Sequence, residues 1–148
     1  MIAIGSDHGG YKLKEEIKKY LEEKGIQYID VGTTSEERTD YPIFAAKVAE
    51  TIQEGRCEKG IVLCRSGAGV AMVANKYRGI RAASIHNEVE AKFAKSDDDI
   101  NVLTLGGDYL SLNEAICIIR NWLGTEFKGG RYKERLDMVE EIENKNMK

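Results

Sequence analysis

The sequence predicts an α/β domain in which a doubly wound, Rossmann-like sheet of five parallel strands lies between two layers of helices. Three observations predict this class: apolar runs alternate with segments of helical periodicity, the 148 residues fit a single domain (1–148), and 42% hydrophobic with 32% charged residues is typical of a folded globular chain. Strands that alternate with helices form parallel sheets through right-handed crossovers.

Two strands and two helices are expected before the third strand. Residues 1–5 form a short apolar run, and residues 11–24 carry apolar side chains at helical spacing. Residues 27–31 predict the second strand. Residues 40–54 predict the next helix, because Pro42 stands in its first turn, where a missing N–H costs least.

The second half of the chain continues the alternation. Strands are expected at residues 60–64, 80–85 and 101–105, and helices at about 70–76, 88–95, 112–123 and 133–144. The last helix carries Leu136, Val139 and Ile142 as an apolar stripe among charged residues. Because the five strands are complete before it begins, we expect this helix to pack on a partner subunit.

Two chemically rich turns are expected to meet at one point of the sheet. The common strand order for five strands is 2-1-3-4-5, and ligands bind where the winding reverses, between strands one and three. Asp7 and His8 follow the first strand, and Cys64, Arg65 and Ser66 follow the third. These turns should therefore face each other across a crevice at the carboxyl ends of the strands.

The turn after the third strand combines a thiol, a hydroxyl and small residues that open a helix. Its sequence is Cys64-Arg65-Ser66-Gly67-Ala68-Gly69. Free backbone N–H groups at such a turn form a site for an anion such as a phosphate or an enolate oxygen. A dinucleotide-binding loop is the rival interpretation of these glycines, but Met72 fills the third glycine position of that fingerprint.

Charge and composition exclude several classes of protein. A net charge of -3 and a pI near 5.5 argue against a nucleic-acid partner. No apolar stretch is long enough to cross a membrane, and the chain begins without a charged leader, so we expect a cytoplasmic protein. Three cysteines (Cys57, Cys64, Cys117) and two histidines show no metal-ligand spacing, so reduced thiols and no metal site are expected.

Several motifs occur in order over nearly the whole chain. They are Asp7-His8-Gly9-Gly10, Arg38-Thr39-Asp40-Tyr41-Pro42, the Cys64 turn, Ala74-Asn75-Lys76, Gly79-Ile80-Arg81-Ala82, Asp99-Ile100-Asn101-Val102-Leu103 and Gly129-Gly130-Arg131. Together they resemble the sugar-phosphate isomerases of the ribose-5-phosphate isomerase type B and galactose-6-phosphate isomerase group. The resemblance implies aldose–ketose isomerisation of a sugar phosphate through a cis-enediolate, without cofactor or metal, with ribose 5-phosphate and ribulose 5-phosphate as the default pair.

The resemblance also assigns roles to residues. It makes Cys64 the base that moves a proton between C1 and C2, and Ser66 the group that passes a proton between the substrate oxygens. Asp7 would bind sugar hydroxyls, and His8 with two arginines would hold the phosphate, in a site shared across a homodimer or higher oligomer. The residues expected to bind the substrate are Asp7, His8, Tyr41, Arg65, Gly67, Ala68, Gly69, Asp98, Arg131 and Arg135.

This chain departs from the resembled pattern at four positions. Asp97 replaces the histidine that opens the sugar ring, and an aspartate is mostly ionised at neutral pH. Asp98 replaces an asparagine, Asp108 replaces a phosphate-contacting arginine, and Arg65 replaces the glycine after the cysteine. We expect Arg65 either to supply the charge lost at position 108 or to recognise another anionic group.

The departures leave alternatives open. The substrate could instead be a tetrose, hexose or acidic sugar, and a sugar-phosphate-binding protein without activity is a further alternative. His86 ends the fourth strand at the active rim. A structural role is favoured for it, with replacement of the ring-opening acid as the alternative.

Overall fold

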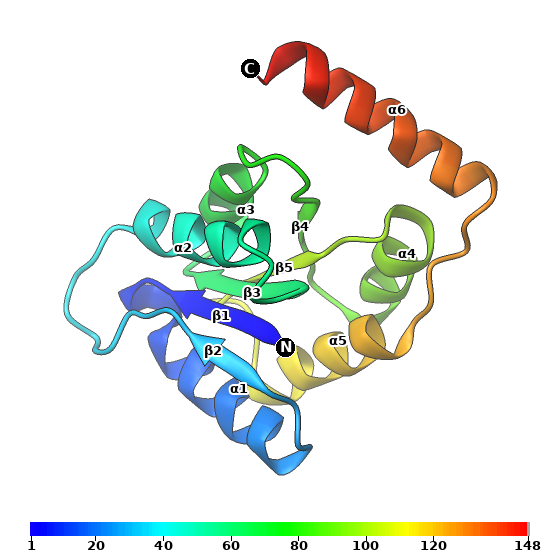
Figure 1. Ribbon diagram of the computed structural model, residues 1–148. Helices are drawn as coiled ribbons and strands as arrows, with labels where there is room; N and C mark the ends of the chain where they lie inside the picture. The colour runs from blue at the N-terminus through cyan, green and yellow to red at the C-terminus, as the bar shows by residue number, and fades with distance from the viewer. Residues whose placement is uncertain (148) are drawn as a thin grey trace.

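Five parallel strands form the centre of the computed structural model, which describes residues 1–147 (Figure 1). The strands are β1 (Ile2–Ser6), β2 (Tyr28–Asp30), β3 (Lys59–Cys64), β4 (Ala82–Ser84) and β5 (Val102–Gly106). The helices are η1 (His8–Gly10, a 3-10 turn), α1 (Tyr11–Glu23), α2 (Tyr41–Gln53), α3 (Ala68–Ala74), α4 (Glu88–Asp98), α5 (Leu112–Gly124) and α6 (Arg131–Asn146). The predicted doubly wound α/β class is confirmed.

The predicted strand order is wrong at one edge of the sheet. The observed order is β2-β1-β3-β5-β4, so β5 and not β4 lies beside β3. All five residues of β5 are buried, which is expected of a central strand covered by helices on both faces. Strand β4 has only three residues, all small and half-buried, which suits a strand at the edge of the sheet. The reversal of winding between β1 and β3 is unaffected, so the predicted crevice keeps its place.

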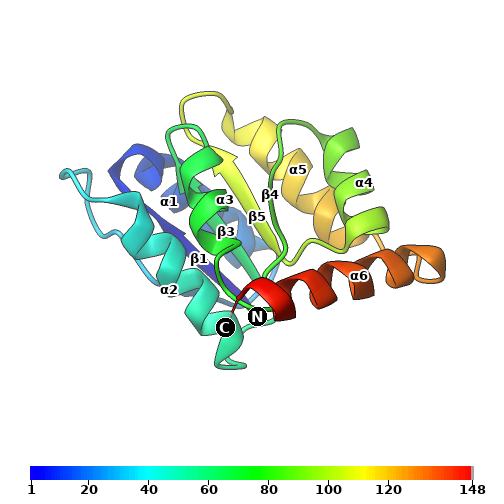
Figure 2. The ribbon, with the colours of Figure 1, turned by 90° about the horizontal axis from the view of Figure 1, so that it is seen from above.

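Alternate residues of the central strands face two separate apolar layers. Ile4 of β1 packs with Ile17, Ile118 and Trp122 on the side of α1, α4 and α5, whereas Ala3 packs toward α2 and α3 (Figure 2). The indole of Trp122 is fully buried, and its Nε1 donates to the carbonyl of Ile100 at 3.0 Å. Because successive side chains of a strand point to opposite faces, the apolar residues of the strands pack against a layer of helices on each face of the sheet.

An ion pair between a buried lysine and a partly exposed aspartate holds the loop that follows β2. The Nζ of Lys14, which is fully buried, donates to both carboxylate oxygens of Asp30 and to the carbonyl of Thr33, each at 2.8 Å. The same loop bonds to the end of β1, because Ser6 accepts from the Thr33 N–H and donates to the carbonyl of Gly32, both at 2.6 Å. This network supports the backbone that leads directly into Asp7.

Helix α6 lies outside the sheet and the two helical layers that cover it (Figure 1) and has no buried residue. Near its end, Glu143 accepts from the Gly79 N–H at 3.1 Å. Its Met138, Val139 and Ile142 are more than half exposed. The predicted packing on a partner subunit stays a prediction.

Within residues 1–147, none of the helices combines the length and the apolar character that a membrane span requires.

Candidate active site

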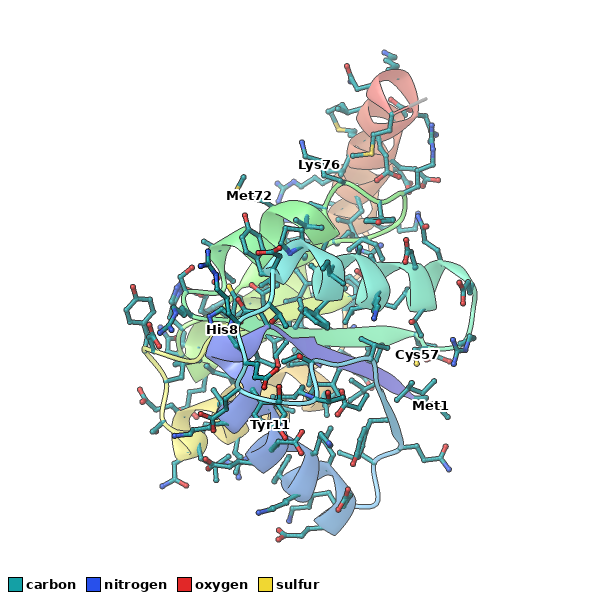
Figure 3. The ribbon with its side chains drawn as sticks, turned by 90° about the vertical axis from the view of Figure 1, so that its left-hand side faces the viewer. Met1, His8, Tyr11, Cys57, Met72 and Lys76 are labelled. Atoms are coloured by element: carbon teal, nitrogen blue, oxygen red, sulfur yellow. The ribbon has the colours of Figure 1, made fainter. Side chains whose placement is uncertain are left out.

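The turns after β1 and β3 meet at one cavity, as predicted from the carboxyl-end rule. The two strands are hydrogen-bonded neighbours, with Ser6 opposite Leu63 at their ends. The cavity has a volume of about 440 Å³ and is lined by Asp7, His8, Arg38, Thr39, Asp40, Tyr41, Cys64, Arg65, Ser66 and Gly69. Figure 3 shows His8 at this end of the sheet, with Cys57 at the opposite end.

The thiol of Cys64 lies almost completely buried at the end of β3. Its Sγ accepts the N–H of Gly67 at 3.1 Å, and Ser66 Oγ accepts the N–H of Ala68 at 3.2 Å. A backbone donor directed at the sulfur stabilises negative charge there. The turn therefore holds a thiol in contact with a donor, beside a hydroxyl that can carry a proton.

Gly67 allows this turn to form. Its φ of +81° lies in the left-handed region, and an added Cβ would stand 2.9 Å from Ser84 Oγ and 3.0 Å from the carbonyl carbon of Leu105. Its carbonyl accepts from the hydroxyl of Thr104 at 2.8 Å. Glycine is thus required both by the backbone angle and by the neighbouring strands.

Asp7 begins the 3-10 turn η1 and is 6% exposed. Its Oδ1 accepts the N–H groups of Gly9 at 2.9 Å and Gly10 at 3.3 Å. Among the described residues both bonds use this one oxygen, so Oδ2 remains available to accept a hydroxyl from a ligand in the cavity. This geometry suits the predicted role in binding sugar hydroxyls.

His8 is held by Thr39, a contact that the sequence did not suggest. The His8 N–H donates to Thr39 Oγ1 at 3.1 Å, and the Thr39 N–H reaches His8 Nδ1 at 3.1 Å. With Nδ1 occupied, Nε2 is the nitrogen that can meet a ligand. The loop carrying Arg38, Thr39 and Asp40 therefore forms one wall of the cavity. None of these three was predicted as a binding residue; the prediction named only Tyr41, which follows the loop as the first residue of α2.

Arg65 and Asp108, two of the departures from the resembled pattern, lie together. Arg65 Nη1 is 3.6 Å from Asp108 Oδ2, and both side chains are largely exposed. The stem of Arg65 lies over Gly9, where an added Cβ would approach Arg65 Cγ to 2.5 Å. Similarly, the ring of Tyr41 lies 2.6 Å from the Cβ position of Gly69. Both glycines make room for side chains that line the cavity.

Other predicted site residues lie outside this cavity within the single chain. Asp97 and Asp98 end α4 in a groove with His86, whose Nδ1 is 3.0 Å from Glu90 Oε1. Arg131 and Arg135 stand exposed at the start of α6. Among residues 1–147, no three side chains of His, Cys, Asp or Glu gather as a metal-binding group.

A cation cluster connects α4 with α6. Lys128 Nζ is 3.0 Å from Asp97 Oδ1 and 4.9 Å from the ring centre of Tyr132. The guanidinium carbons of Arg131 and Arg135 lie 5.3 and 5.4 Å from the same ring centre. A hydrogen bond from Lys128 lowers the pKa of Asp97, which keeps this carboxyl ionised at neutral pH.

Comparison with known proteins identifies the family. A family model described as Ribose/Galactose Isomerase matches residues 2–139. The chain is 40% identical to ribose-5-phosphate isomerase B of Escherichia coli, over 97% of each chain. It superposes with a TM-score of 0.96 on ribose-5-phosphate isomerase B of Clostridium thermocellum, at 46% identity and 97% coverage of both chains.

A third relative contains a ligand. The Mycoplasma genitalium ribose-5-phosphate isomerase B, solved with bound ribulose 5-phosphate, has a TM-score of 0.92 and 36% identity, covering 97% of this chain and 95% of its own. The resemblance inferred from the motifs is thereby confirmed. The chain belongs to the Ribose/Galactose Isomerase family, and its class is that of an aldose–ketose isomerase.

Proposed function

We propose that this isomerase interconverts ribose 5-phosphate and ribulose 5-phosphate, with Cys64 as the base that moves the proton between C2 and C1. The observation that carries the proposal is the cavity in which Cys64 and Ser66 face Asp7 and His8. The names of the relatives from Escherichia coli and Clostridium thermocellum support the choice of substrate.

The reaction proceeds in three proton transfers. The Cys64 thiolate removes the C2 proton of the open-chain aldose, and the C–H electron pair moves to form the C1–C2 double bond of a cis-enediolate. Ser66 passes a proton between the two substrate oxygens. The thiol then returns its proton to C1, which gives the ketose, while backbone N–H groups of the turn stabilise the negative charge.

The binding groups come from two subunits under this proposal. Arg131 and Arg135 lie outside the cavity in the chain itself, at the start of a helix whose apolar side chains are exposed. We propose a homodimer or higher oligomer in which α6 of one subunit brings these arginines to the phosphate bound in the cavity of the other. Two guanidinium groups at i and i+4 can bind one phosphate together.

A panel of aldose and ketose phosphates tests the reaction. The assay measures turnover of ribose 5-phosphate and of tetrose, hexose and acidic sugar phosphates by wild type, Cys64→Ala and Cys57→Ala. Cys57 is a matched control, because it is equally buried but lies at the opposite end of the sheet (Figure 3). We expect turnover that Cys64→Ala abolishes and Cys57→Ala retains. Absence of Cys64-dependent turnover on every compound would refute the proposal.

The same panel separates catalysis from binding alone. In heavy water an isomerase introduces deuterium at C1 or C2 of its substrate, whereas a protein that only binds sugar phosphates does not. Sedimentation of the active protein tests the shared site, since a fully active monomer would contradict it.

A further inference from the structure

A pentose phosphate must open its ring before a proton can leave C2. The aldose is mainly a cyclic hemiacetal in water, and opening requires an acid that protonates the ring oxygen O4. O4 is bonded to C4, and the phosphate is carried on the adjacent C5. The acid must therefore lie beside the group that binds the phosphate.

Tyr132 lies among the cations that bind the phosphate under the proposed function. Its ring is within 5.4 Å of the guanidinium carbons of Arg131 and Arg135, and Lys128 Nζ is 4.9 Å from the ring centre. Arg131 Nη2 donates to Tyr132 Oη at 3.4 Å. The phenol is thus held at the same place as the two arginines.

The phenol keeps its own proton available. The bond from Arg131 uses a lone pair of Oη, so the O–H group is free to donate. The hydrogen bond from Arg131 and the charge of Lys128 lower the pKa of Tyr132, and the same cations stabilise the phenolate left after proton transfer. The lowering brings the pKa of this phenol from its ordinary range toward neutral pH, where a general acid works best.

Asp97 lacks this property, although it occupies the ring-opening position implied by the family resemblance. Its Oδ1 is 3.0 Å from Lys128 Nζ, and Ser96 Oγ donates to the same oxygen at 3.1 Å. Both contacts stabilise the carboxylate, which has no proton to give. Asp97 instead anchors Lys128 beside the ring of Tyr132.

We propose that Tyr132 of one subunit is the acid that opens the ring of the sugar phosphate bound in the Cys64 cavity of the other. The C1–O4 bond breaks, its electron pair goes to O4, and O4 takes the Tyr132 proton. The O1 hydroxyl proton passes to water as the C1 carbonyl forms, and solvent reprotonates the phenolate. This inference rests on the proposed function.

Two measurements on Tyr132→Phe test the proposal. We expect kcat/KM for the conversion of ribose 5-phosphate to fall by about 100-fold, within the range usual for loss of a general acid. Ribulose 5-phosphate is acyclic, so the entry of solvent deuterium at its C1 needs no ring opening and should remain near the wild-type rate. Tyr77→Phe, which removes a phenol bonded to Glu50 away from the site, should change neither measurement.

The outcomes distinguish the inference from the function on which it rests. Conversion of ribose 5-phosphate at the wild-type rate by Tyr132→Phe would overturn the inference. If Tyr132→Phe lost deuterium exchange to the same extent as conversion, the inference would also be overturned. The phenol would then position the arginines and would not donate a proton. If Asp97→Asn lost the conversion of ribose 5-phosphate but kept deuterium exchange, and Tyr132→Phe did not, the acid would be Asp97. If Cys64→Ala exchanged deuterium as fast as wild type, the proposed function itself would fail.

Discussion

Replacement of Asp30 by asparagine tests how the loop behind the active site is held. The fully buried ammonium of Lys14 would lose its charged partner and keep the carbonyl of Thr33. Removing one member of a buried ion pair costs about 3–5 kcal/mol. Glu15 Oε2, 3.4 Å from Lys14 Nζ, compensates part of the charge. We therefore expect Asp30→Asn to lower the free energy of unfolding by about 3 kcal/mol, the lower end of that range.

Thermal and urea unfolding measure this loss. With an unfolding entropy of about 2.1 cal/mol/K per residue over 148 residues, 3 kcal/mol corresponds to a fall in Tm of about 10 °C. Glu15→Gln is the control on the exposed side of the network and should cost less than about 0.5 kcal/mol. The double variant Lys14→Met, Asp30→Leu should recover most of the stability, because no buried charge remains. A loss below about 1 kcal/mol for Asp30→Asn would refute the reasoning.

The pH dependence of stability provides an independent check. Burial alone raises the pKa of Asp30, but hydrogen bonds from Lys14 and Lys18 outweigh it, so the pKa of Asp30 is lower in the folded chain than in the unfolded chain. Its contribution is complete above the unfolded value of about 3.9 and is lost as the pH falls through the folded value. The stability difference between wild type and Asp30→Asn should narrow in acid. A constant difference across this range would contradict the assignment.

Three further substitutions test the site and the core. Arg65→Gly should raise KM for the true substrate severalfold with little change in kcat, and an unchanged KM in steady-state kinetics would remove Arg65 from substrate binding. Gly67→Ala should lower kcat at least about tenfold and destabilise the fold by about 1–2 kcal/mol, measured by kinetics and urea unfolding, because the left-handed angle disfavours a Cβ. Trp122→Phe should cost about 1–3 kcal/mol in urea unfolding, since the buried carbonyl of Ile100 loses its donor.

The sequence predicted the strands and helices because most of their signals are local. An apolar run such as that of β3 and the period of helix α1 are visible in a few consecutive residues. The order of β4 and β5 was not predicted correctly, because it depends on which strand is better covered by helices on both faces. That comparison involves packing between segments distant in the sequence.

The active-site turns were predictable for a different reason. The carboxyl ends of β1 and β3 must lie together in a doubly wound sheet, so the sequence alone predicts Asp7 and Cys64 at one cavity. The support of His8 by Thr39 had no local signal, because those bonds join a turn to a loop that is fixed only by the folded chain. The role proposed for Tyr132 likewise depends on three cations that meet around one ring.

The ion pair between Arg65 and Asp108 changes how the departures from the family pattern are interpreted. Taken singly, the acid at position 108 would repel a phosphate, and the cation at position 65 would interrupt a small-residue turn. Because Arg65 Nη1 lies 3.6 Å from Asp108 Oδ2, the two charges partly neutralise each other. Both side chains are exposed, so the ion pair is weak, and a bound anion can replace Asp108 as the partner of Arg65. We therefore expect Asp108 to hold the guanidinium at the rim of the cavity until the substrate arrives. Asp108→Asn should consequently lower KM in steady-state kinetics, because Arg65 no longer has to separate from a carboxylate before it binds the substrate. An increased KM would instead show that Asp108 contacts the substrate directly.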